Sequence, residues 1–209
     1  MKINRITLCL LMIIVVSFGA SLTLKAGIGV GAWDVLAQTG SSITGVQIGT
    51  VGMIFNLLCI IIQLYLLRKN FQIKHAMQIV LCILLGYTIN FFFYEVLGNI
   101  DLSNYRIRVV ILIIGYIINA FTVAVIMLLD VVTFSLEGAC KAISDKTGIQ
   151  LSRLRQAVDI ICIIIASLVA FSFNIPHAAR EGTVIGMIIF GPAMGIFMKK
   201  LKPVFKNMV

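Results

Sequence analysis

The chain has 209 residues, of which 60% are hydrophobic and only 12% are charged, and its mean hydropathy is +1.08. Soluble domains carry roughly 45–50% apolar residues, so this composition excludes an ordinary soluble protein and predicts a chain that lies in a lipid bilayer. Six spans of about 20 residues each use roughly 120 residues. The remaining loops are too short for a separate catalytic domain, and we expect a single membrane domain over residues 1–209.

Apolar runs, taken in chain order, predict six transmembrane helices in an all-α fold. Each run is long enough to cross the hydrocarbon core with its backbone hydrogen bonds closed internally. The first run resembles a signal peptide, but no convincing small-residue cleavage site follows it, so we expect it to remain as a helix. The runs are Ile6–Leu24, Val46–Leu67, Ala76–Leu97, Val109–Leu129, Leu154–Phe173 and Thr183–Met198.

The distribution of basic residues predicts the orientation of these spans. The chain holds 17 Lys and Arg against 8 Asp and Glu, a net charge of +9. With the N-terminus in the cytoplasm, all basic residues fall on the inner side except Lys25, Arg106, Arg108 and Arg180. Lys and Arg favour the cytoplasmic side of a membrane. We therefore expect both termini in the cytoplasm, and the positive charge needs no nucleic-acid partner.

Two short segments between spans are too short and too polar to cross. Ala32–Thr44 precedes the second span, and Thr133–Lys146 has the same relative position in the second half. We expect both to be interfacial or re-entrant. Trp33, the single tryptophan, fits a headgroup boundary, with ligand stacking as the alternative.

An internal repeat appears when the sequence is shifted by 103 residues. The shift aligns Asp34 with Glu137 and Asn56 with Asp159, without a gap, and it matches a polar and glycine pattern near both pairs. Three spans per unit is an odd number, which predicts two inverted repeats at about 5–100 and 106–200, as in many secondary transporters. The alternative is an old duplication that serves packing alone. The matched pattern is Ser41, Thr44, Gly45 and Gln47 with Ser144, Thr147, Gly148 and Gln150.

Four polar side chains lie near span centres, where an unpaired amide or carboxylate is costly. They are Asn56, Asn90, Asn119 and Asp159. Asn56 and Asp159 are repeat-related, so we expect them to face each other across a pseudo-twofold axis and to mark a binding site. Hydrogen bonding between helices is the alternative role of the three asparagines.

Arg155 lies one helical turn before Asp159. The two can form an i, i+4 ion pair with a purely structural role. Alternatively, Asp159 accepts a proton or a cation, and Arg155 controls its release. We expect Asp34 and Glu137 at the entrances to the site.

The other motifs do not indicate an enzyme. The five cysteines show no paired spacing and fit small core residues, and no nucleophile, paired-carboxylate or phosphate-loop pattern is present. We expect no catalysis, no cofactor and no metal. The leading hypothesis is a small-solute site between the repeats. The alternative is a non-transporting membrane subunit or regulator, such as the capture component of a larger transporter. A homo-oligomer and a membrane partner both stay open.

The string Ala26–Leu36, followed by Thr44–Thr50, resembles the first signature of the YczE/YyaS/YitT family of membrane proteins, and Gly182–Ile185 with Gly191-Pro192 resembles its C-terminal signature. Ala32 replaces the usual proline, and Asp130–Ser135 lacks the glycine-rich turn common in relatives. The resemblance implies a multi-pass protein of the bacterial cytoplasmic membrane and implies no particular activity.

Overall fold

The computed structural model describes residues 5–206, which are helical apart from short connections. The predicted cytoplasmic termini, residues 1–4 and 207–209, lie outside the described range. The helical elements are α1 (Arg5–Ala26), α2 (Ala32–Thr44), α3 (Ile48–Leu67), η1 (Arg68–Asn70), α4 (Ile73–Asn90), η2 (Phe91–Val96), α5 (Tyr105–Leu129), α6 (Ser135–Thr147), α7 (Leu151–Ser172) and α8 (Glu181–Lys206).

All six predicted spans are confirmed as helices long and apolar enough to cross a membrane. They are α1, α3, α4 continued by η2, α5, α7 and α8. The two short segments form α2 and α6, each of 13 residues, which is less than the roughly 20 residues that a transmembrane helix needs. Many large apolar side chains are exposed on the long helices, a surface that suits contact with lipid.

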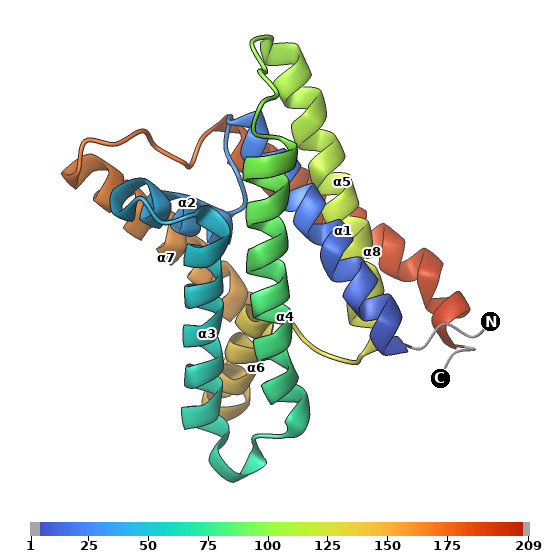
Figure 1. Ribbon diagram of the computed structural model, residues 1–209. Coiled ribbons are helices and arrows are strands. Elements are labelled where there is room, and N and C mark those ends of the chain that lie inside the picture. The colour runs from blue at the N-terminus through green and yellow to red at the C-terminus, as the bar shows by residue number, and fades with distance from the viewer. Residues whose placement is uncertain (1–4, 207–209) are drawn as a thin grey trace.

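Five of the long helices pack in two groups that meet where α1 contacts α4 (Figure 1). In one group α5 lies between α1 and α8, and in the other α3 packs on α4, which also touches α1. Helix α2 packs on α7, and α6 packs on α3. Leu201 and Phe205 of α8 pack on the cluster that contains Cys9 and Ile13 of α1, so the start of α1 and the end of α8 lie together.

Glycines allow the closest helix crossings. A Cβ on Gly115 of α5 would lie 2.9 Å from the carbonyl oxygen of Gly19 in α1, and one on Gly86 of α4 would lie 2.7 Å from that of Gly49 in α3. Small residues let membrane helices approach until their backbones touch. A larger side chain at either place would push the helices apart.

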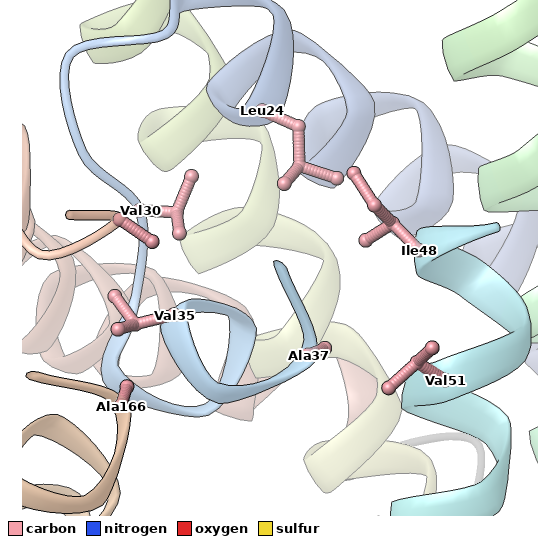
Figure 2. Packing of buried hydrophobic residues seen from close by; sticks show 8 residues of the cluster. Leu24, Val30, Val35, Ala37, Ile48, Val51 and Ala166 are labelled. Carbon is pink, nitrogen blue, oxygen red and sulfur yellow. The ribbon is translucent and has the colours of Figure 1, made fainter. Parts of the chain in front are cut away.

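The loop before α2 is anchored by a buried apolar cluster (Figure 2). Leu24 of α1, Val30 of the loop, Val35 of α2 and Ala166 of α7 contribute to it, and each is less than 5% exposed. Backbone pairing adds a second anchor, because the Gly182 N–H donates to the Ile28 oxygen at 2.7 Å. These contacts set where the first turn of α2 lies.

The sequence repeat corresponds to a repeat of local hydrogen bonding. Helix α6 begins and ends 103 residues after α2. Each helix ends at a left-handed glycine, Gly45 with φ 70° and Gly148 with φ 74°, a conformation that glycine adopts without strain. The Ser41 hydroxyl donates to the Val46 oxygen at 2.6 Å, and its counterpart Ser144 donates to the Ile149 oxygen at 2.6 Å.

One element is not anticipated by the hydropathy pattern. The last part of the third span, Phe91–Val96, forms a π-helical turn, η2, at the end of α4. Such turns are rare and are found frequently at functional sites.

Candidate functional site

Charged side chains from α6 and α7 form an ion-paired group. Arg155 pairs with Asp159, one turn further along α7, as the sequence predicts. Its Nε also lies 3.5 Å from Oε1 of Glu137 on α6. All three side chains are partly buried. One guanidinium therefore joins carboxylates from two helices.

Asp34, in the first turn of α2, belongs to the same electrostatic environment. Burial raises the pKa of its carboxyl to about 6, the positive charge of Arg155 acts against this shift, and the negative charge of Asp159 adds to it. Asp34 is thus near enough to sense the Arg155–Asp159 pair. We call Asp34, Glu137, Arg155 and Asp159 the carboxylate cluster. It combines three acids with one base.

Trp33 packs between helices next to this cluster. Its ring contacts Phe55 of α3 edge-on, with centroids 6.1 Å apart. It packs against a buried group that includes Leu136, as Val158 also does; Leu136 and Val158 precede Glu137 and Asp159 in the sequence. The indole Nε1 is buried and has no hydrogen-bond partner. Trp33 therefore contributes to the packing of α2, α3, α6 and α7, and it leaves one unpaired donor there.

The side chain of Asn56 has different hydrogen-bond partners from Asp159, its counterpart in the repeat. Its Nδ2 donates to the Gly52 oxygen of its own helix at 2.9 Å. The side chain lines a cavity of about 20 Å³ together with Gln78 and Ser135, which is room for about one water molecule. Among the hydrogen bonds of the described residues, none joins Asn56 to Asp159.

Asn90 and Asn119 lie at two other helix crossings. Asn90 accepts from the Gly49 N–H at 2.7 Å and donates to the Thr50 hydroxyl at 2.9 Å, so it caps the start of α3 and joins it to α4. Asn119 of α5 abuts Gly19 of α1, and its Oδ1 is buried without a partner. The interhelical role expected as the alternative fits Asn90.

Two buried glutamines, Gln63 and Gln78, were not among the site residues predicted from the sequence. Gln63 is 0% exposed, and its Nε2 donates to Gln78 Oε1 at 2.9 Å and to the Ser135 oxygen at 3.0 Å. A Cβ on Gly138 would lie 2.6 Å from Gln63 Oε1. The signal was present in the sequence, because both glutamines interrupt apolar runs as the asparagines do.

The chemistry available at the carboxylate cluster follows from its side chains. Within residues 5–206, no group of three or more His, Cys, Asp or Glu side chains is arranged to hold a metal ion. The five cysteines are buried and unpaired, as small core residues would be. The groups that remain are carboxylates, one guanidinium and an indole N–H, which together can bind a proton or a small polar or cationic group.

Comparison with known proteins identifies a family. The model of a family of unknown function, DUF6198, matches residues 3–199, which is nearly the whole chain. No curated protein matches. No solved structure matches either.

Proposed function

The chain belongs to DUF6198, a family of unknown function, and we propose that it binds and moves a small solute at a site between two inverted three-helix halves. The site is the carboxylate cluster. The observation that carries the proposal is the ion-paired group at Arg155, which joins Glu137 of one short helix to Asp159 and lies within electrostatic reach of Asp34 on the other short helix.

Reciprocal packing supports the inverted halves. Each short helix packs on a long helix of the other half, α2 on α7 and α6 on α3. Three spans per half is an odd number, so the second half enters the membrane in the opposite sense. Transporters of this plan bind their solute at the interface of the halves.

An asymmetry between equivalent helix pairs supports movement. Helices α3 and α4 pack closely through Gly49 and Gly86. Their counterparts α7 and α8 do not pack extensively in the described chain. In an inverted-repeat carrier the two halves exchange such conformations, which opens the site to one side and then to the other.

The charge balance indicates the chemistry of the solute. With every group ionised, the carboxylate cluster has an excess of acid over base, and charged groups inside a membrane domain are costly unless they pair or bind something. We infer that the site takes a proton or a solute with a cationic group. It involves no catalytic step and no cofactor.

The proposal also includes the orientation of the chain in the membrane and its relationship to a known family. The excess of basic residues on one side supports both termini in the cytoplasm of a bacterial cell. The signatures at Ala26–Leu36 and Gly182–Ile185 support descent from a common ancestor with the YczE/YyaS/YitT family.

The test is a ligand screen on purified protein followed by Asp159→Asn. A bound solute raises the melting temperature by mass action. We expect Asp159→Asn to abolish this shift and solute flux into liposomes while the unliganded protein still folds. Asp145→Asn, an exposed acid on α6, is the matched control and should behave as wild type. Full binding and flux in Asp159→Asn would remove this residue from the mechanism.

A second candidate function is a non-transporting subunit, and the exposure of α8 favours it. Only Gly182, Thr183 and Gly186 are buried among the described residues of this helix, so most of α8 is open to another membrane protein. Co-purification in mild detergent separates the candidates. A stoichiometric complex with an ATPase would support capture for a larger transporter, whereas flux by the chain alone would support a carrier.

A further inference from the structure

A concave site lies away from the carboxylate cluster, along α3, α4 and η2. Its volume is about 1010 Å³, at the upper end of the roughly 300–1,000 Å³ of small-molecule sites. We call it the α3–α4 cleft. Its lining shares no residue with the carboxylate cluster and includes Gln47, Met53, Ile83, Tyr87, Phe91 and Glu95.

The cleft opens sideways, toward the bilayer. Four of its lining side chains, Val80, Ile83, Tyr87 and Phe91, are exposed, and all belong to the membrane-spanning segment His75–Val96. An occupant can therefore enter from the lipid without passing through the interior of the protein.

Polar and apolar lining residues are separated along the cleft. Ile83 lies near the middle of the span and Val80 nearer its beginning, whereas Glu95 lies at its end and Gln47 directly precedes α3. The distance from Val80 to Glu95 is roughly 22 Å at 1.5 Å per residue, longer than one leaflet of a core about 30 Å thick. The shape suits an amphiphile with its head near Glu95 and its chain beside Val80.

The polar end has the chemistry of an ammonium site. Glu95 is the one charged residue in the lining, and it has no hydrogen bond or ion pair among those found in residues 5–206. Phe91 lines the same cleft one helical turn before Glu95, and aromatic faces attract quaternary ammonium groups. Phe91 and Glu95 both belong to the π-helical turn η2.

Two other polar side chains at this end, Asn90 and Thr50, are already engaged. Asn90 bonds Gly49 and Thr50, and the lining contains no Lys or Arg that would bind a phosphate. This favours a head without phosphate over a phospholipid headgroup. We propose that the α3–α4 cleft binds a phosphate-free alkylammonium amphiphile that enters from the bilayer.

The experiment compares three ligands of one chain length on the purified full chain in a neutral detergent. The probes are decyltrimethylammonium, decylphosphocholine and decanol, and the readout is saturable binding by native mass spectrometry. We expect decyltrimethylammonium to bind most tightly. Glu95→Gln should weaken its binding about fivefold or more, the size of one charge or cation–π contact. Phe91→Leu should reduce its preference over decanol.

The matched control is Asp101→Asn, an exposed acid in the connection after η2 that does not line the cleft. It should bind all three probes as wild type does. Equal or tighter binding of decylphosphocholine would indicate a phospholipid site and overturn the proposal, as would unchanged ammonium binding in Glu95→Gln or binding that never saturates. Because Glu95 is exposed, its substitution leaves the packed helix contacts in place.

Discussion

At the scale of single residues, the carboxylate cluster depends on one guanidinium shared by two helices. Arg155 pairs with Asp159 on its own helix and with Glu137 on α6, while Asp34 interacts with the group only through its charge. Removing one member of a partly buried ion pair leaves the opposite charge unpaired in a poorly solvated place. Each member should therefore respond differently to substitution and to pH.

Asp34 should make stability depend on pH. Its pKa is about 6 in the folded protein, against an ordinary value of 3.8, so the folded state binds the proton more tightly than the unfolded state. The resulting stabilisation is complete below about pH 4 and is lost as pH rises through about 6. We expect the melting temperature of wild type in detergent to fall over this range and that of Asp34→Asn to change less. An equal fall in both proteins would contradict the assignment, and Asp145→Asn serves as the control.

Arg155→Gln should destabilise the protein by about 1–2 kcal/mol, because Glu137 and Asp159 then repel each other without a cation. The double variant Arg155→Gln/Asp159→Asn should recover part of this loss, since only one carboxylate stays unpaired. Unfolding titrations of both single variants and the double variant would give the coupling energy. If the two single-variant losses of stability add up to the loss in the double variant, the Arg155–Asp159 pair contributes no coupling energy.

At the scale of elements, the α3–α6 and α2–α7 crossings differ in which helix carries the larger side chain. It is the long helix in the first crossing and the short helix in the second. In the α3–α6 crossing a large side chain, Gln63, meets Gly138. At the equivalent positions of the α2–α7 crossing a small side chain, Ala166, lies in one cluster with Val35 (Figure 2). Close-packed interiors tolerate such exchanges when the total volume is preserved. The pairs therefore keep similar geometry with different residues.

Gly138→Val should be strongly destabilising, by about 1–3 kcal/mol or more, because the new side chain would overlap the Gln63 amide. The double variant Gly138→Val/Gln63→Ala has the same two residue types as Val35 and Ala166 in the α2–α7 crossing. It should therefore recover part of the lost stability. The rescue stays incomplete because Gln78 loses its hydrogen-bond partner. Thermal unfolding of the three variants tests this, and a double variant less stable than Gly138→Val would refute the equivalence of the crossings.

At the scale of the whole molecule, the helix pairs that correspond under the 103-residue shift are packed alike with one main exception. The pairs α1–α4 and α5–α8 both pack, as do α2–α3 and α6–α7. The exception is that α3 and α4 pack closely through Gly49 and Gly86, while α7 and α8 lack extensive contact within residues 5–206. A carrier that alternates should also adopt the exchanged arrangement.

A cross-link between α7 and α8 would detect this exchanged arrangement. Ser152 and Ile189 lie 103 residues after Gly49 and Gly86. In a background with the five native cysteines replaced by alanine, we expect Ser152→Cys/Ile189→Cys to form an intramolecular disulfide under oxidation, because part of the population brings α7 onto α8. Single-cysteine variants control for links between molecules. No cross-link with or without a solute would argue against alternation.

Much of this architecture could be predicted from local sequence signals. Hydropathy located the six spans because each must hide its backbone polar groups from lipid. The repeat matched Gly45 with Gly148, and the two glycines share a left-handed conformation at the ends of the short helices. Charge spacing predicted the Arg155–Asp159 pair, since residues four apart share one face of a helix.

Only the tertiary structure decided which polar groups share a site. Asn56 and Asp159 are equivalent in sequence, yet Asn56 lines a cavity with Gln78 while Asp159 joins Arg155 and, through it, Glu137. Helical periodicity places residues on a face, but the rotation of that face depends on neighbours distant in sequence, such as the Gly138 contact with Gln63. Those contacts, which no local pattern encodes, determine the site.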